Sequence, residues 1–441
     1  MSKLKLFLIL ASALLISCVN PNDPEDTGNG GGTGTGGGNG GGGTGGGSGN
    51  PSWFLTDADQ KTPKMIHKIT LGQTVGQKQY YRIPAVIVTK KNTIIAAFDN
   101  RKTSNNDIGF SASDLIEPTV RRSTDGGKTW SDNIRVGKVP DSQINSHGDP
   151  VLFETKEGNL VMLAASGGAF AWQTEKKSRI TVSMSTDDGL TWSDWKEVQG
   201  TIFDSGSKLY TAGYKKGFAA SGRGTTLSDG TLVCTLLVTG EDGRSQKGAA
   251  TYYSKDGGTT WNVGGIVQYP SNAFDEPKII AELVSGEHKG KLLMTARPNE
   301  FGKERFWAVA DGVEGNWTQV SYATGLIDGR ANAEGVRYTL ASEGHAKDRL
   351  LFLNCNSANE RTQLTLHMSE DEGKTWNAIS KKVIQPGRSC YSSIDVLGDG
   401  TIITFAEEPS TATELDNYDL VFRRFNLSWF ANGSQSYSDT W

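Results

Sequence analysis

The sequence predicts an all-β protein, a six-bladed β-propeller with Asp-box hairpin turns. Three observations support this prediction: a short phrase recurs around the chain, the apolar runs are short, and helical periodicity is nearly absent. The runs are bounded by Gly, Asp or Asn, as strands are, and include IIAAF, LVCTLLV, KLLMTA, RLLFL and TIITFA. The 441 residues would by length alone suggest about two or three domains, but the blades of a propeller share one closed ring.

The recurring phrase is Ser-x-Asp-x-Gly-x-Thr-Trp, here called the Asp box. Four copies occupy residues 123–130, 185–192, 254–261 and 369–376, and a decayed copy occupies residues 310–317. The four copies start 62, 69 and 115 residues apart, and the decayed copy falls within the longest gap. Five units, together with the sequence before the first, indicate about six sheets arranged around one axis.

The residue types of the Asp box suit a hairpin turn. Asp accepts hydrogen bonds from nearby backbone N–H groups, and Gly adopts positive φ without steric cost. The Trp offers a large apolar surface that anchors the turn on a neighbouring strand. Because the phrase repeats around the chain, whereas a catalytic group is needed once, we assign it to the scaffold.

The N-terminus has the features of a targeting segment. Lys3 and Lys5 precede an apolar run over residues 6–16, and residues 15–18 read Leu-Ile-Ser-Cys. This tetrapeptide resembles a bacterial lipobox, which implies a signal peptide over residues 1–17 and lipidation of Cys18. An uncleaved transmembrane anchor is the alternative, but the apolar run has 11 residues and a span needs about 20.

A glycine-rich segment follows. Of the 22 residues from 28 to 49, 16 are Gly, a composition that cannot bury enough surface to fold. We expect residues 18–50 to form a disordered tether with a mean reach of about 30 Å, and residues 51–441 to form the propeller domain. The expected location is the bacterial cell envelope, with the protein lipid-anchored at the outer membrane, on the cell surface or in the periplasm.

Charge and cysteine usage exclude several classes of partner. The net charge is −4, and loss of Lys3 and Lys5 with the signal peptide leaves 43 basic against 49 acidic residues, a net charge of −6. No basic stripe is visible, which argues against a nucleic-acid partner. Cys234, Cys355 and Cys390 lack CxxC spacing and the five His lack ligand-like spacing, so we expect no metal, no cofactor and no disulfide framework. We also expect a monomer.

The motif Tyr-Arg-Ile-Pro-Ala at residues 81–85 has no evident scaffold role. Followed by repeated Asp boxes, it resembles the bacterial sialidases, which are exo-α-sialidases of the retaining glycoside hydrolase type. The resemblance covers about residues 65–427. It implies hydrolysis of terminal α-linked sialic acid from glycoproteins and glycolipids, with retention at the anomeric carbon through a covalent tyrosyl-sialyl intermediate.

The resemblance also implies a cluster of three arginines. Sialic acid carries a carboxylate on its anomeric carbon, and guanidinium groups bind a carboxylate through charge-assisted, bidentate hydrogen bonds. The residues of this chain that match the family's arginines are Arg82, Arg297 and Arg361. Arg305 and Arg388 are rival candidates nearby.

The matching nucleophile is Tyr391, in the segment GRSCYSSIDVL, and the matching base is Glu282. A carboxylate nucleophile would be repelled by the carboxylate of the substrate, and sialidases are the known tyrosine exception among glycosidases. A phenol has a pKa of about 10 and therefore needs a base beside it.

The acid that protonates the leaving oxygen matches Asp107, in the segment NNDIG. Asp99 and Asp114 compete for this role on the same segment. Arg101 matches an additional substrate-contacting arginine. Asp149, which precedes a proline, matches an aspartate that lines the family's sugar pocket, although a turn role is the alternative.

Two other classes of function remain. A sialic-acid-binding lectin or adhesin would keep the arginines and lose Tyr391, Glu282 or Asp107, all of which are present. A scaffold propeller would leave the Arg-Ile-Pro motif without a reason. Within the enzyme class, a trans-sialidase or an enzyme with an anhydro product differs by its acceptor-site loops, which the sequence does not resolve.

Overall fold

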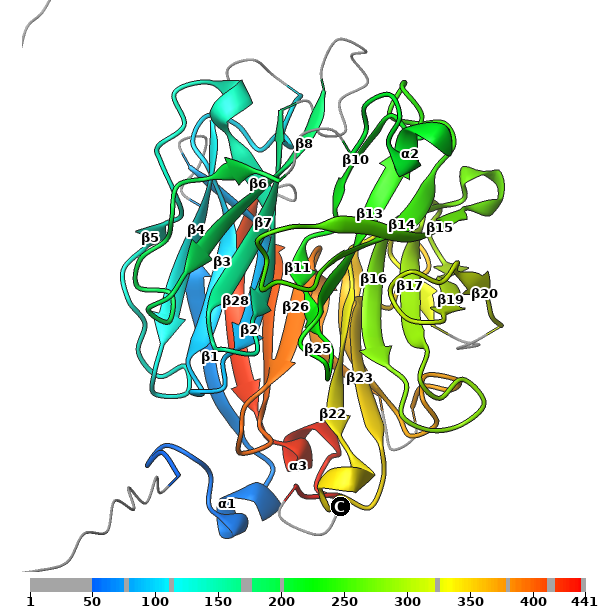
Figure 1. Cartoon of the computed structure of the whole chain (residues 1–441). Coiled ribbons are helices and arrows are strands. Elements are labelled where there is room, and N and C mark those ends of the chain that lie inside the picture. Colours follow the sequence, from blue (N-terminus) through cyan, green and yellow to red (C-terminus); the bar gives the residue numbers. More distant parts are fainter. Residues whose placement is uncertain are drawn as a thin grey trace, which may run out of the picture. The chain divides into compact units, whose positions relative to one another are not determined.

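The computed structural model contains six mainly antiparallel sheets arranged around a central axis, here called the hub (Figure 1). This confirms the predicted six-bladed propeller. The structure describes residues 50–74, 79–110, 115–167, 177–198, 202–321, 326–377, 381–410 and 417–437. The expected signal peptide, Cys18, the glycine-rich tether and Asp114 lie outside these ranges.

The four main strands of blades 1 to 5 follow the chain outward from the hub. Blade 1 comprises β2 (Tyr80–Val88), β3 (Ile94–Arg101), β4 (Ile116–Ser123) and β5 (Ile134–Arg135). Blade 2 comprises β6 (His147–Glu154), β7 (Leu160–Gly167), β8 (Ser178–Ser185) and β9 (Lys196–Glu197), with β11 (Gly222–Arg223) parallel to β6. Blade 3 comprises β10 (Lys216–Ala219), β13 (Leu232–Thr239), β14 (Gly248–Ser254) and β15 (Asn262–Gln268), with β12 (Thr225–Thr226) also paired to β13.

The second half of the ring repeats this order. Blade 4 comprises β16 (Phe274–Glu282), β17 (Leu292–Pro298), β19 (Phe306–Ala310) and β20 (Thr318–Gln319). Blade 5 comprises β22 (Glu334–Thr339), β23 (Arg349–Cys355), β24 (Thr362–Ser369) and β25 (Lys382–Arg388). Blade 6 comprises β26 (Ser392–Val396), β27 (Ile402–Pro409), β28 (Tyr418–Phe425) and β1 (Met65–Gly72). A short ribbon pairs β18 (Lys303–Glu304) with β21 (Ile327–Asp328).

The ring is closed by the first strand of the chain. β1 is the outermost strand of blade 6 and pairs antiparallel with β28, so that Ile69 lies opposite Phe422. The pairing joins segments from the two ends of the described chain (Figure 1). It covers an edge that would otherwise present unpaired backbone groups.

Helices are few and short in the described ranges. The α-helices are α1 (Asp57–Lys61), α2 (Lys208–Thr211) and α3 (Leu427–Phe430), and the 3₁₀ turns are η1 (Gln143–Asn145), η2 (Pro270–Asn272) and η3 (Ala341–Glu343). None of these helices has the length and apolar character needed to cross a membrane.

The Asp boxes form the turns between the third and fourth strands of their blades. In the first copy, Ser123 donates a hydrogen bond to Asp125 (2.8 Å) and Asp125 accepts from the backbone N–H of Thr129 (2.9 Å). The Trp130 indole donates to the carbonyl of Gly127 (3.0 Å). The other three intact copies repeat these Ser–Asp and Asp–Thr contacts. The turn geometry therefore accounts for the conserved spacing within the phrase.

Six hydrophobic clusters form the core, one between each pair of neighbouring blades. The alternating side chains of β3 show how one strand contributes to two of these clusters. Ile94 and Phe98 pack in the cluster shared with blade 6, whereas Ile95 packs in the cluster shared with blade 2. Successive side chains of a strand point to opposite faces of its sheet, so each blade is buried on both faces.

Candidate active site

Three inner strands are interrupted by a bulge at the same place, close to where each begins. The pairing registers of β2, β6 and β16 shift around Pro84, Pro150 and Pro277. Proline cannot donate to a strand ladder, so in sheets it is tolerated at bulges. In each case the residue before the proline lines one pocket, and these residues are Ile83, Asp149 and Glu276.

This pocket has a volume of about 140 Å³ and collects residues from several blades at one end of the hub. Its apolar wall comprises Ile108, Phe110 and Phe218. The Asp boxes occupy the opposite end of the blades: in blade 1, Arg82 pairs with Asp99, whereas Ser123 pairs with Ile94 at the far end of β3. The scaffold turns and the pocket are therefore separated by the length of a blade.

The Tyr391 hydroxyl lies at the centre of the pocket's polar contacts. It donates a hydrogen bond of 2.6 Å to Oε1 of Glu276 and accepts one of 3.0 Å from Nη1 of Arg297. Arg297 also forms ion pairs with Oε2 of Glu276 (3.0 Å) and Oδ1 of Asp275 (3.1 Å). Tyrosine, carboxylate and guanidinium thus form one contact network.

The pKa values of this network are shifted by burial. Burial raises the pKa of Tyr391 well above its ordinary value, and Arg297 only partly opposes that shift. Burial also raises the pKa of Glu276, against the opposing effect of Arg297. The resting phenol is therefore protonated, and Glu276 is a stronger base than an exposed glutamate.

Arg82 and Arg361 flank the ring of Tyr391. Each guanidinium carbon lies 5.9 Å from the ring centroid. Arg361 donates from Nε to the carbonyl of Arg330 (3.0 Å) and from Nη1 to Sγ of Cys390 (3.0 Å). The structure therefore brings Arg82, Arg297 and Arg361 together around the phenol.

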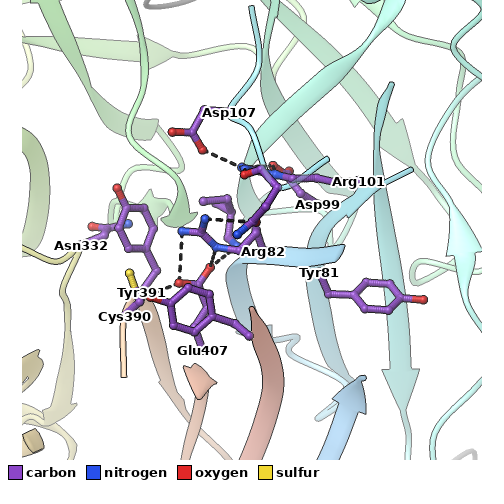
Figure 2. A network of polar contacts seen from close by, with 12 residues as sticks. Tyr81, Arg82, Asp99, Arg101, Asp107, Asn332, Cys390, Tyr391 and Glu407 are labelled. Carbon is purple, nitrogen blue, oxygen red and sulfur yellow. Dashed lines mark hydrogen bonds and ion pairs between the residues drawn. The ribbon is translucent and has the colours of Figure 1, made fainter. Parts of the chain in front are cut away.

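Glu407 in β27 holds Arg82 in place (Figure 2). Its carboxylate lies 2.7 Å from Nε of Arg82 and also accepts the backbone N–H groups of Ile83 (2.8 Å) and Tyr391 (3.0 Å). Burial opposes ionisation of Glu407, but Arg82 and these donors keep its pKa below the ordinary value. No motif in the sequence pointed to this residue, which holds an arginine and the backbone of the tyrosine in place together.

Asp107 belongs to a second polar group, which is centred on Arg101 (Figure 2). Arg101 pairs through Nη1 with Asp107 (2.9 Å) and through Nη2 with Asp99 (3.0 Å). The Arg101 side chain is only 1% exposed, whereas that of Asp107 is 59% exposed. Arg101 thus lies behind Asp107, and Asp107 faces the pocket opening.

The three carboxylates of this group differ in environment. Burial raises the pKa of Asp99 to about 6, and burial together with Asp99 and Asp107 raises the pKa of Asp149 well above its ordinary value. Burial would also raise the pKa of Asp107, but Arg101 and Arg82 lower it overall. Asp149 has a left-handed φ of 57° and donates its N–H to Asp99 (3.0 Å), so it lines the pocket instead of serving an ordinary turn.

Glu282 does not lie beside Tyr391, and the expected pairing is wrong. Glu282 is the last residue of β16, six positions beyond Glu276, a separation of about 20 Å along a strand. Its carbonyl accepts a hydrogen bond from Arg337 (3.0 Å). The sequence signal that identifies Glu276 is the proline after it, which also follows Ile83 and Asp149 in the other bulged strands.

Of the rival arginines, Arg305 has a fully buried side chain that pairs with Asp328 (2.8 Å). Arg388 ends β25 in blade 5 and hydrogen-bonds to Tyr418, whose ring centroid lies 5.0 Å from the guanidinium carbon of Arg82, so it lies close to the arginine cluster. Asp99 is 1% exposed and is engaged by Arg101. In the parts of the chain that the structure describes, no group of three or more His, Cys, Asp or Glu side chains could hold a metal ion.

The family model and the related sequences that match this chain agree with one another. Residues 96–404 match the model of the BNR repeat-like domain. A sialidase of Micromonospora viridifaciens is 31% identical over 367 residues, which cover 79% of this chain and 52% of the relative. A sialidase of Bacteroides fragilis is 30% identical over 339 residues, which cover 71% of this chain and 58% of the relative.

Solved structures agree on the fold. The Hadza microbial sialidase Hz136 superposes with a TM-score of 0.67 at 24% identity, covering 82% of this chain and 69% of that chain. The present chain spans little more than half the length of the two curated relatives named above.

Proposed function

This chain belongs to the family with a BNR repeat-like domain, and on that premise we propose that it is an exo-α-sialidase. It hydrolyses terminal α-linked sialic acid from glycoproteins and glycolipids. The observation that carries the proposal is the Tyr391 hydroxyl, held between Glu276 and Arg297 in a hub pocket flanked by two further arginines. A tyrosine that served only to pack between blades would not require contacts with a carboxylate and three guanidinium groups.

The arginines bind the substrate carboxylate. Arg82, Arg297 and Arg361 come from blades 1, 4 and 5, each is held by a protein partner, and all three lie against the same tyrosine. A planar carboxylate is the anion whose geometry matches such donors. Their positive charge also stabilises an oxocarbenium-like transition state beside the bound carboxylate.

In the first step, the Tyr391 oxygen forms a bond to the anomeric carbon while its proton passes to Glu276. The bond from the anomeric carbon to the glycosidic oxygen breaks, and Asp107, which has taken up a proton from solvent through its exposed carboxyl, donates that proton to the oxygen. The raised pKa of Glu276 suits a group that must accept a phenol proton. The product of this step is a sialic acid covalently attached to Tyr391.

In the second step, Asp107 accepts a proton from water as the water oxygen attacks the anomeric carbon. The bond to Tyr391 breaks, and Glu276 returns its proton to the phenol oxygen. Two displacements at one carbon retain its configuration. Arg101 pairs with Asp99 and Asp107 and so positions Asp107, while the substrate contact expected of it from the sequence stays a prediction.

We also propose that Cys18 carries a lipid that holds the protein in the bacterial cell envelope. The support is the lipobox-like tetrapeptide after a short apolar run, followed by a glycine-rich segment. The tether would let the propeller reach glycans some distance from the lipid surface.

The experiment that tests the function is turnover of 3′-sialyllactose by the full chain, followed by NMR. We expect free sialic acid whose α-anomer appears first, as retention requires. Initial release of the β-anomer contradicts the tyrosyl intermediate. A transferred or anhydro product identifies the trans-sialidase alternatives, and binding without turnover identifies the lectin alternative.

A further inference from the structure

Arg330, a residue with a left-handed backbone, lies next to the arginine cluster. Arg330, between β21 and β22, has φ 57°, close to the values of Ile83 (59°) and Asp149 (57°) in the pocket. Residues other than glycine seldom adopt this conformation, and such strain collects at functional sites. Twelve described residues other than glycine have positive φ; two of them, Ile83 and Asp149, line the pocket already described, and Arg330 contacts the arginine cluster through Arg361.

The backbone and the side chain of Arg330 have different partners. Its carbonyl accepts the Nε–H of Arg361 (3.0 Å). Its guanidinium carbon lies 5.0 Å from the ring centroid of Phe301. Among the described residues no carboxylate pairs with this half-buried guanidinium, which leaves its donors available to a ligand.

Phe301 occupies the connection that follows β17, four residues after Arg297. Its side chain is 40% exposed, which is unusual for a large apolar ring. The Phe301–Arg330 pair is therefore joined through one member to the segment of Arg297 and through the other to Arg361. Both of those arginines contact the network of Tyr391.

The chemistry of sialosides indicates what lies at this position. The carboxylate and the glycosidic oxygen share the anomeric carbon, so the group that is cleaved off begins at the end of the sugar held by the arginines. We propose that Phe301 and Arg330 form the subsite for the aglycone sugar, the pyranose to which the sialic acid is linked. This inference rests on the proposed sialidase function.

The two side chains suit a pyranose. The aromatic ring packs against the C–H groups of one sugar face, and the guanidinium donates hydrogen bonds to hydroxyl oxygens. The left-handed backbone of Arg330 lets one residue fix Arg361 through its carbonyl and contact the aglycone through its side chain. Arg330 would then contribute to binding of the sialic acid, through Arg361, and to binding of the aglycone sugar, through its own side chain.

The test compares a substrate that has an aglycone sugar with one that has none. We would measure kcat/KM for 3′-sialyllactose and for α-sialyl fluoride, whose leaving group is a single atom, in wild type, Phe301→Ala and Arg330→Asn. Asparagine tolerates left-handed φ better than most residues, so the carbonyl that holds Arg361 is kept. Tyr210→Ala is the control, since Tyr210 is a 38% exposed aromatic residue in α2.

We expect kcat/KM for 3′-sialyllactose to fall about tenfold relative to that for α-sialyl fluoride in both variants, and the ratio to stay at the wild-type value in Tyr210→Ala. An unchanged ratio of the two kcat/KM values would overturn the subsite. Equal losses on both substrates would show an effect through Arg361, and no loss on either would show that the side chain does not contact the aglycone. A wild-type protein that turns over neither substrate contradicts the sialidase proposal itself, and the subsite with it.

Discussion

The hydroxyl of Tyr391 lies 2.6 Å from a carboxylate oxygen of Glu276, although the two residues are 115 positions apart. Blade 6 supplies the phenol and blade 4 the base. Burial keeps the proton on the phenol at rest, and the raised pKa of Glu276 prepares it to receive that proton. The proton transfer proposed for these two residues would run along this hydrogen bond.

Glu276→Gln should lower kcat/KM for sialosides by about 10² to 10⁴, the usual contribution of a general base. Gln keeps the size of the side chain and loses its basicity. Glu282→Gln, on the same strand but at its other end, is the matched control and should stay within about twofold of wild type. A larger loss in the Glu282 variant than in the Glu276 variant would reverse the assignment.

Tyr391→Phe should abolish most turnover, by about 10³ or more, because the attacking oxygen is removed. The melting temperature should change by a few degrees at most, since the ring still packs in the same cluster. Turnover by steady-state kinetics and unfolding by calorimetry check the two statements. Near-wild-type kcat in a folded variant would exclude Tyr391 as the nucleophile.

The loss of turnover in Asp107→Ala should depend on the leaving group of the substrate. Turnover of 3′-sialyllactose should fall by about 10² to 10³, because its leaving alkoxide needs a proton. The loss in the bond-breaking step should be much smaller with α-sialyl fluoride, because fluoride leaves without protonation. Pre-steady-state release of fluoride measures that step alone. Equal defects with both substrates would contradict an acid role for Asp107.

Glu407→Gln should destabilise the fold by about 3 kcal/mol, because Arg82 would remain buried without its counter-charge. Urea unfolding measures this difference. Glu287→Gln removes an exposed pair with Lys374 (3.3 Å) and should cost less than about 1 kcal/mol. Comparable losses in the two variants would contradict a special role for the Glu407–Arg82 pair.

The stabilisation by Glu407 should also depend on pH. Since Arg82 holds its pKa below the ordinary value in the folded protein, the contribution is present above the unfolded pKa of about 4.3. It is lost as the pH falls through the lower folded value. The stability difference between wild type and Glu407→Gln should therefore narrow in acid.

Cys18→Ser should move the protein from the membrane fraction to the soluble fraction of the producing cells, because lipidation requires the thiol. Specific activity per folded molecule should not change, since the propeller comprises residues beyond the tether. Fractionation with detergent extraction measures the first statement. A variant that remains in the membrane fraction would contradict the lipid anchor.

The ring was predictable because its signal is local. Each Asp box satisfies its own turn through contacts within a few residues, as between Ser123, Asp125 and Thr129, so the phrase is preserved wherever the turn recurs. Arg82 and Tyr391 were identifiable for a related reason: each stands in a short motif, Arg-Ile-Pro or Tyr-Ser-Ser. The sequence by itself therefore determined the architecture and pointed to Arg82 and Tyr391, which the structure places together in the candidate site.

Only the tertiary structure decided which carboxylates act with them. Glu276 and Glu282 share one strand, and nothing in its apolar pattern tells which end meets Tyr391; the bulge at Pro277 and the packing of blade 4 around the hub set this. The role of Glu407 could not be recognised from the sequence, because its contact with Arg82 exists only in the closed ring. The physical reason is that hub contacts join residues from separate blades, so their partners depend on how the sheets are arranged in space and not on neighbours along the chain.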